Sequence, residues 1–310
     1  MKVLVAGSAG LAGGAIAKRA ELLGHQVIRL TRSDVDLRVF EETKQFICDH
    51  KPDIVISAAA KVGGIVANND FPVEYMLENL EIQNNVISAS HIANVNKVVF
   101  LGSSCIYPRD CQQPIKEEFL LTGPLESTNS AYAIAKIAGV ELINSYRKEY
   151  GRNWVSVMPT NLYGPGDNFN LQNSHVLPAL LRKFSEAKEN GSGKVTLWGS
   201  GSPRREFLYI DDFARAVMTV AEKYDEKLHL NIGTGADISI KKLAELVSET
   251  VGYQGEISWD TSKPDGTPRK VLDVSRMKAL GWEPKIDLKN GIKNTLDWFK
   301  SETAKGRVRM

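Results

Sequence analysis

The sequence predicts an α/β fold, with a doubly wound parallel sheet and a smaller C-terminal α/β domain. Short apolar, β-branched runs recur through the first half of the chain, and helical patterns follow most of them, as buried parallel strands and their crossover helices require. A glycine-rich turn at residues 7–13 joins the first strand to the first helix. Small hydroxyl residues follow the strand predicted at residues 97–101. Such strand ends are typical of a Rossmann-type sheet.

The first strand and helix form a candidate phosphate-binding unit. Residues 2–6 are mostly apolar, glycines follow at positions 7, 10 and 13, and an alanine-rich helix runs to residue 23. Glycines let the backbone approach a pyrophosphate, and the helix N-terminus offers free N–H groups and positive partial charge. The Gly-x-x-Gly-x-x-Gly spacing differs from the usual dinucleotide pattern, so a tight turn without a ligand is the alternative.

The second strand, at residues 26–30, bears on the choice of dinucleotide. NAD binders place a carboxylate at this strand end, where it bonds the ribose 2′-hydroxyl. Here Thr31 and Arg32 follow the strand, and a guanidinium suits a 2′-phosphate. We therefore expect NADP(H). The alternative is that Asp34 or Asp36 reaches the ribose instead.

The third strand, at residues 53–57, leads into three alanines that leave space for a flat ring or a ribose. A long helical pattern follows at residues 72–92. Together with the helix predicted at residues 131–150, it would suit an intersubunit four-helix bundle, so we expect a homodimer.

The stretch from Leu101 to Lys136 carries the candidate chemistry. Ser103 lies just past a strand end, and Tyr132 and Lys136 are four residues apart on one helix face. An ammonium lowers the pKa of a nearby phenol, and a serine hydroxyl can bond the same substrate oxygen. These groups can protonate or deprotonate a carbonyl or carbinol oxygen while a hydride moves at its carbon. A solvated helix face is the alternative, which the nucleotide turn disfavours.

A proline- and glycine-rich segment, residues 159–166, follows the strand predicted at 154–159 and predicts a fixed, non-helical loop. It lies at the sheet edge that the nicotinamide end of a dinucleotide would reach. Ser174 is the expected N-cap of a helix that ends near residue 189. By itself, the neighbouring His175 is best interpreted as a surface histidine.

The C-terminal half predicts a substrate domain interleaved with the last strands of the sheet. Strands are expected at residues 195–198 and 228–232, helices from Asp211 to about 224 and at 240–251, and a loop at 262–270. Four cations are candidates for binding a diphosphate, although each alone is consistent with a solvated surface: Lys183, Arg205, Arg269 and Lys270. We expect residues 1–165 to form the nucleotide-binding domain, residues 206–233 to return to it, and residues 166–310 to form mainly the substrate domain.

The overall charge, the apolar content and the number of cysteines exclude several classes of protein. The 310 residues carry 39 Lys and Arg against 37 Asp and Glu, so no bulk charge favours nucleic acid or an anionic membrane. No apolar run approaches the roughly 20 residues of a membrane span, and we expect no signal peptide because a strand begins at residue 2. Three cysteines predict no disulfide framework. We therefore expect a cytoplasmic protein without nucleic-acid, membrane or metal partners.

A set of motifs spread over nearly the whole chain resembles the GDP-L-fucose synthases, a family of extended short-chain dehydrogenase/reductases. These motifs are Ala-Ala-Ala-Lys-Val-Gly-Gly-Ile (58–65), Gly-Ser-Ser-Cys-Ile-Tyr-Pro (102–108), Tyr-Ala-Ile-Ala-Lys (132–136), Met-Pro-Thr-Asn-Leu-Tyr-Gly-Pro (158–165), Asn-Ser-His-Val (173–176), Trp-Gly-Ser-Gly (198–201), Arg-Glu-Phe-Leu (205–208) and Lys-Pro-Asp-Gly-Thr-Pro-Arg-Lys (263–270).

The resemblance implies conversion of GDP-4-keto-6-deoxy-D-mannose to GDP-L-fucose, by 3,5-epimerisation and then NADPH-dependent reduction at C4. Cys105 matches the family's epimerisation base, and His175 matches its acid. A thiolate near cations is a credible carbon base, and an imidazole donates protons well near neutral pH. Ser103, Tyr132 and Lys136 match the reductase triad, in which the tyrosine stabilises the enolate and later protonates the C4 oxygen.

The resemblance also implies binding residues. Together with the strand-end residues considered above, the expected NADP(H) contacts are Gly7, Ser8, Ala9, Gly10, Leu11, Ala12, Gly13, Arg32, Asp36, Leu37, Ala58, Ala59, Leu101, Gly102, Ser103, Lys136, Pro159, Thr160, Asn161, Leu162 and His175. The expected substrate contacts are Lys183, Trp198, Arg205, Asp265 and Lys270. Some relatives carry arginine in the glycine turn, where this chain has Ser8 and Ala9, and some carry arginine in place of Lys183. Cys111 matches no catalytic position.

Two other functions fit parts of the sequence. The first is another nucleotide-sugar epimerase or reductase of the extended short-chain family, such as an epimerase that retains its nicotinamide and releases no reduced sugar. The second is a non-catalytic protein that senses NADP. Because such proteins often lose the tyrosine and lysine pair, the presence of Tyr132 and Lys136 disfavours the second.

Overall fold

A six-stranded parallel sheet forms the centre of the molecule in this computed structural model, which describes residues 1–263 and 265–310. Its spatial order is β2-β1-β3-β4-β5-β9. The strands are β1 (Lys2–Ala6), β2 (Gln26–Leu30), β3 (Ile54–Ser57), β4 (Lys97–Leu101), β5 (Val155–Pro159) and β9 (Leu230–Ile232). The winding direction reverses at β1, so the crevice outside the ends of β1 and β3 is where an open α/β sheet binds ligands.

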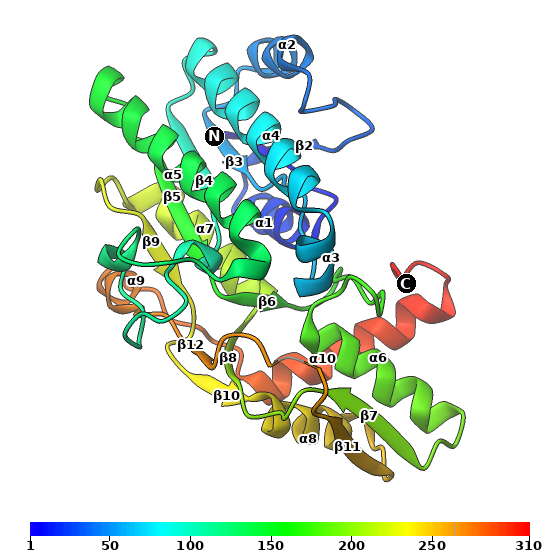
Figure 1. Cartoon of the computed structure of the whole chain (residues 1–310). Helices are drawn as coiled ribbons and strands as arrows, with labels where there is room; N and C mark the ends of the chain where they lie inside the picture. The colour runs from blue at the N-terminus through cyan, green and yellow to red at the C-terminus, as the bar shows by residue number, and fades with distance from the viewer. Residues whose placement is uncertain (264) are drawn as a thin grey trace.

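Helices cover both faces of this sheet (Figure 1). One face packs against α1 (Leu11–Leu22) and α7 (Ile210–Lys223), the other against α2 (Phe40–His50), α4 (Pro72–Ile92) and α5 (Ser130–Tyr150). The side chains of β1 alternate between the two cores, with Val3 and Val5 in one and Leu4 and Ala6 in the other. The predicted doubly wound α/β fold is confirmed.

A second group of elements surrounds a third core that includes Phe184, Phe207 and Leu296. Its helices are α6 (Val176–Glu189), α8 (Ile240–Val251) and α10 (Leu288–Ala304), and its strands are β6 (Asn161–Tyr163), β7 (Lys194–Trp198), β8 (Arg204–Tyr209), β10 (Asp237–Ser239), β11 (Glu256–Asp260) and β12 (Arg269–Lys270). Strand β8 pairs with β10, β12 and β6, and β11 pairs with β7. The described residues also form two short helices, α3 (Ile65–Asp70) and α9 (Ser275–Ala279), and 3₁₀ turns at Ser104–Ile106, Glu117–Phe119 and Ser127–Asn129. No helix in the described ranges combines the length and apolarity needed to cross a bilayer.

Two segments predicted as loops contain strands. Residues 161–163, inside the expected loop at 159–166, form β6 and pair in parallel with residues 207–209 of β8. Residues 269–270, at the end of the expected loop at 262–270, form β12 and pair with residues 204–205 of the same strand. The loop assignment was wrong for these paired residues, because the pairing partner is distant in sequence and local composition does not reveal it. Residues 159–166 are otherwise non-helical, as predicted. Pro264, within the second segment, lies outside the described residues.

Candidate active site

The glycine turn between β1 and α1 leaves room for an anion. Gly7 has a φ of +88°, a left-handed conformation, and a Cβ there would lie 2.7 Å from the backbone of Ala59. A Cβ on Gly13 would lie 2.2 Å from the carbonyl oxygen of Gly7. Gly10 caps α1 without a side-chain hydrogen bond. The start of α1 therefore presents backbone N–H groups beside small residues, a geometry that fits a pyrophosphate.

Neighbouring strand ends support this turn. The N–H groups of Gly7 and Ser8 both donate to the carbonyl oxygen of Leu30, at 2.9 and 3.1 Å, and the Ser8 hydroxyl donates to the same oxygen. The Ala58 N–H donates to the carbonyl oxygen of Ala6 at 3.0 Å. The ends of β1, β2 and β3 are thereby joined around the turn that is expected to hold the phosphates.

The acidic residues that follow β2 are already engaged. Arg38 forms a bidentate ion pair with Asp36, and its hydrogen bonds lower the pKa of that carboxyl to about 2. Asp34 accepts hydrogen bonds from the backbone and side chain of Thr31, which lower its pKa. Arg32 is exposed, and no hydrogen bond or ion pair among the described residues involves its side chain. The free cation beside two occupied carboxylates fits a ribose 2′-phosphate.

A short 3₁₀ turn after β4 presents Cys105. The turn spans Ser104–Ile106 and is capped by Ser103, whose hydroxyl accepts the Cys105 N–H at 3.2 Å. Two residues on, the buried Tyr107 hydroxyl donates to Asn231 Oδ1 at 2.5 Å and lies 3.0 Å from His229 Nε2. The turn is thus fixed at both ends, by the serine cap and by the tyrosine anchor.

Tyr132 and Lys136 are both buried on the face of α5 that meets β4. Lys136 Nζ donates to the carbonyl oxygen of Leu101 at 3.0 Å and lies 5.8 Å from the centre of the Tyr132 ring. Burial lowers the pKa of Lys136 to about 7. Burial also raises the pKa of Tyr132, and the nearby Cys105 raises it further, whereas a hydrogen bond with Ser103 opposes the rise.

The sequence predicts that the pKa of Tyr132 is lowered, and this prediction is wrong because the pKa is raised. The spacing of four residues does place the ammonium near the phenol, as predicted, but removal from water outweighs that proximity. A phenol with a raised pKa remains protonated at neutral pH, which is the form needed to donate a proton to a carbonyl oxygen.

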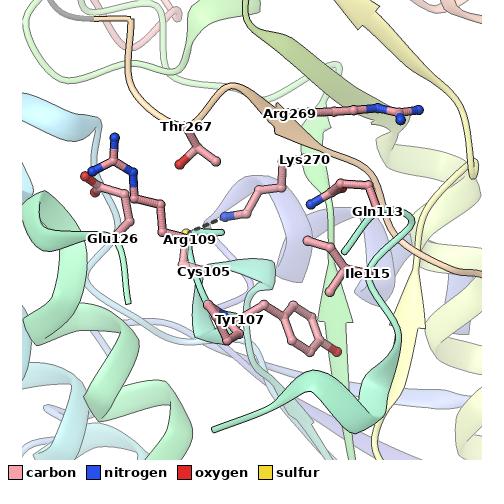
Figure 2. A pocket seen from close by; sticks show the side chains of 10 residues that line it. Cys105, Tyr107, Arg109, Gln113, Ile115, Glu126, Thr267, Arg269 and Lys270 are labelled. Carbon is pink, nitrogen blue, oxygen red and sulfur yellow. Dashed lines mark hydrogen bonds between the residues drawn. The ribbon is translucent and has the colours of Figure 1, made fainter. Parts of the chain in front are cut away.

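The sulfur of Cys105 is approached by two nitrogen donors. Lys270 Nζ lies 3.7 Å from Sγ and Asn129 Nδ2 lies 3.6 Å from it. Figure 2 shows the Lys270 ammonium pointing at the sulfur across a small cavity. The cavity is lined by Cys105, Tyr107, Pro108, Arg109, Gln113, Ile115, Glu126, Thr267, Arg269 and Lys270. A cation and an amide donor both stabilise a thiolate, the form of cysteine that acts as a base.

His175, not Ser174, is the N-cap residue of α6. The backbone explains the shift, because the Ser174 N–H donates to the carbonyl oxygen of Asn170, and the Gly64 N–H donates to that of Asn173. The Ser174 hydroxyl is left buried without a hydrogen-bond partner among the described residues. His175 is exposed, as the sequence predicts, and the groups packed around its ring remove it partly from water and lower its pKa. No hydrogen bond in the described part of the chain joins it to Cys105 or Tyr132.

The segment after β5 is held against β8. The Thr160 hydroxyl and the Asn161 side-chain amide both donate to the carbonyl oxygen of Glu206, at 3.1 and 2.8 Å. The Thr160 N–H donates to the carbonyl oxygen of Ile232. Residues 159–162 therefore lie at the junction between the central sheet and β8, next to the β4 end that carries Ser103.

The expected substrate residues lie in two places, around the Trp198 ring and near the Cys105 sulfur. Trp198 is 60% exposed at the end of β7, with Lys183 Nζ and Lys263 Nζ at 5.9 and 5.6 Å from its ring. Arg205 is close enough to Cys105 for their charges to interact, although burial lowers its pKa. Asp265 accepts hydrogen bonds from the backbone and hydroxyl of Ser200.

The four candidate cations do not all converge. Arg269 forms an ion pair with Asp237, and Lys270 turns instead to the sulfur of Cys105. Sequence reasoning missed Asn129 at the sulfur and Lys263 over Trp198. Asn129 directly precedes α5 and so lies at its N-cap, a position that could have identified it.

Known proteins with similar sequences and structures agree with the fold and the site described above. Residues 3–233 match the model of the NAD dependent epimerase/dehydratase family. The chain is 50% identical to GDP-L-fucose synthase 1 of Arabidopsis thaliana over 96% of this chain and 93% of that protein, and 48% identical to the GDP-L-fucose synthase of Escherichia coli (strain K12) over 96% of each. A crystal structure of a GDP-L-fucose synthetase from Naegleria fowleri bound to NADP superposes with a TM-score of 0.91 at 31% identity, covering 100% of this chain and 96% of that one. The chain belongs to the NAD dependent epimerase/dehydratase family and, within it, to the GDP-L-fucose synthases.

Proposed function

We propose that this enzyme converts GDP-4-keto-6-deoxy-D-mannose to GDP-L-fucose, by epimerisation at C3 and C5 followed by reduction at C4. The observation that carries the proposal is that Ser103 caps the turn that presents Cys105, just past the end of β4, and that Tyr132 is near enough to both side chains for them to shift its pKa. A carbon base and a donor to a carbonyl oxygen are both needed at one ketone, and this arrangement places both beside the same strand end.

The epimerisation uses the acidity of carbon atoms beside a ketone. The Cys105 thiolate removes a proton from C3 or C5, and the electron pair moves into the C4 carbonyl to give an enolate. The Tyr132 hydroxyl donates a hydrogen bond to the enolate oxygen. His175 then returns a proton to the opposite face of the carbon, and its lowered pKa makes its imidazolium a stronger acid.

The same tyrosine serves the reduction. NADPH, when bound, supplies the hydride that reduces C4. Tyr132 transfers its proton to the C4 oxygen, which becomes the carbinol hydroxyl, and the Ser103 hydroxyl, which opposes the rise in the Tyr132 pKa, is placed to bond the same substrate oxygen. Lys136 lies beside the tyrosine ring and is held by the carbonyl oxygen of Leu101, so its ammonium is positioned to favour the phenolate that remains.

The two ligands have different binding regions in this proposal. The central sheet and the helices that cover it hold NADP(H) through the glycine turn and Arg32. The second group of elements holds the GDP-sugar, with the exposed Trp198 ring as a platform for the base. Lys183, Lys263 and Arg205 supply positive charge for the diphosphate.

We also propose a cytoplasmic homodimer. Its support is a set of exposed apolar side chains on α4 and α5, which lie side by side on one face of the sheet (Figure 1). They are Val73, Leu77, Ile92, Ile134 and Tyr150. Two copies of this helix pair would bury these side chains in a four-helix bundle.

The proposed function is tested by incubating the enzyme with GDP-4-keto-6-deoxy-D-mannose and NADPH in heavy water. We expect GDP-L-fucose with deuterium at C3 and C5, together with one NADPH oxidised per product molecule. Nuclear magnetic resonance of the product and absorbance of NADPH measure both. Epimerised ketone without NADPH oxidation would instead identify an epimerase that retains its nicotinamide.

The role of Tyr132 predicts the effect of Tyr132→Phe. Loss of the hydroxyl should slow C4 reduction by roughly two to four orders of magnitude, the range for a lost acid/base group. Steady-state NADPH oxidation measures this, with Tyr146→Phe as the control, because Tyr146 lies on the same helix and its hydroxyl donates to the Ser88 hydroxyl. Full activity of Tyr132→Phe would remove the central assignment.

The role of Cys105 predicts a division between the two reactions. In Cys105→Ser the hydroxyl is too weak a base for carbon, so deuterium should no longer enter C3 or C5. Reduction of the unepimerised ketone at C4 should continue, because Tyr132 and Lys136 are unchanged. Product analysis in heavy water measures both steps. Loss of both in a folded variant contradicts the division.

The role of Arg32 predicts cofactor preference. Arg32→Ala should raise the KM for NADPH by about ten- to a hundredfold, the factor for a lost hydrogen bond to a charged group, and leave the KM for NADH unchanged. Arg29→Ala is the matched control, because Arg29 lies on β2 and pairs with Glu21. Equal KM values for the two cofactors in the unaltered enzyme would show that Arg32 does not bind a 2′-phosphate.

A further inference from the structure

Glu206 is a buried carboxylate that the proposed mechanism does not use. Its side chain lies on β8 and is fully inaccessible to solvent. Burial raises its pKa, and hydrogen bonds from backbone N–H groups oppose that rise. An ionised carboxylate can only accept hydrogen bonds, and burying it is costly unless it accepts several. A buried carboxylate therefore marks a place where several N–H groups need an acceptor.

Two separate chain segments donate to this carboxylate. Oε1 accepts the N–H groups of Thr234 and Gly235, at 2.5 and 2.6 Å. Oε2 accepts the Leu272 N–H at 2.9 Å. The neighbouring Gly233 permits the approach, because a Cβ there would lie 2.3 Å from Oε1. Glu206 thus joins the turn after β9 to the chain that follows β12.

The segment joined in this way carries Lys270. Strand β12 has only two residues, and its pairing with β8 alone supplies few hydrogen bonds to fix a long side chain. Leu272, two residues beyond Lys270, is buried, so its N–H needs a partner that water cannot supply. Glu206 is that partner. Gln113 and Ile115 bond the intervening Val271, which completes the clamp.

We propose that Glu206 is a positioning residue that holds the Lys270 ammonium against the sulfur of Cys105. This inference rests on the proposed role of Cys105 as the epimerisation base. Glu206 touches neither substrate nor sulfur. It fixes the backbone from which Lys270 reaches across 3.7 Å to Sγ, and this ammonium favours the thiolate.

The test measures the reactivity of Cys105 in the whole enzyme without substrate. Iodoacetamide reacts with the thiolate, and mass spectrometry of the Cys105 peptide gives its rate constant at neutral pH. Lys270→Met should slow this reaction by roughly tenfold, the factor that corresponds to about 1.4 kcal/mol of lost thiolate stabilisation. Glu206→Gln should slow it by about three- to tenfold, because its NH₂ group would face a backbone donor and release one segment. Cys48 is an internal reference whose rate should not change.

A double variant shows whether Glu206 acts through Lys270. Glu206→Gln with Lys270→Met should react at the same rate as Lys270→Met alone, since the ammonium is already gone. A further loss in the double variant would overturn the proposal. An unchanged rate in folded Glu206→Gln would overturn it as well.

Asp212→Asn is the matched control. Asp212 is also buried, and its Oδ2 accepts the N–H groups of Lys285 and Ile286, both at 2.8 Å. None of its hydrogen bonds among the described residues reaches Cys105 or Lys270. This variant should lose stability without slowing alkylation of Cys105. Slower alkylation in both variants would mean general loosening and would contradict a positioning role.

Hydrogen exchange tests the clamp without a substitution, in case Glu206→Gln does not fold. The backbone amides of Thr234, Gly235 and Leu272 should be protected together in the unaltered enzyme. Exchange of the Leu272 amide as fast as in an exposed loop would overturn the proposal. Failure of the proposed function is a separate result, because the unaltered enzyme would then show no deuterium at C3 or C5 while alkylation still responded to Lys270.

Discussion

The contact between Lys270 Nζ and Cys105 Sγ joins segments that are 165 residues apart, and the rest of the site depends on it. A thiol is a weak base unless a nearby cation stabilises its thiolate. The sulfur belongs to a turn at the end of β4, whereas the ammonium belongs to a strand paired with β8. The fold must therefore bring the central sheet and the second group of elements together at the end of β4. The pairing of β6 and β12 with β8 does this.

Burial determines the protonation states of Tyr132 and Lys136 beside this contact. Tyr132 and Lys136 lie where water is excluded, so the phenol keeps its proton and the pKa of the amine falls to about 7. In the proposed mechanism this protonated phenol donates to the ketone oxygen in both reactions. The same donor then serves whether Cys105 removes a proton beside the ketone or a hydride is added at C4, so the two proposed reactions can share one site.

The local patterns were sufficient for the central sheet. The long helix at residues 72–92 and the helix at 240–251 have the predicted bounds, because the pattern that predicts each helix lies within its own stretch of sequence. Strands β6 and β12 were expected as loops, and β8, which pairs with both, was not predicted, because these partners are not neighbours in sequence. Strands β10 and β11 and helix α10 were not predicted either. The N-cap of α6 was predicted at Ser174 but lies at His175, because backbone hydrogen bonds of the preceding segment determine where the helix begins. Similarly, a spacing of four residues predicts that Tyr132 and Lys136 are close but contains no information about their removal from water.

The central claim is that one pocket serves both reactions. A crystal structure of the enzyme with NADPH and the keto sugar tests it most directly. We expect the sugar C4 oxygen within hydrogen-bond reach of the Tyr132 hydroxyl, the nicotinamide ring over C4, and the Cys105 sulfur facing C3 and C5. A nicotinamide ring bound far from both the Cys105 sulfur and the Tyr132 hydroxyl would contradict this account.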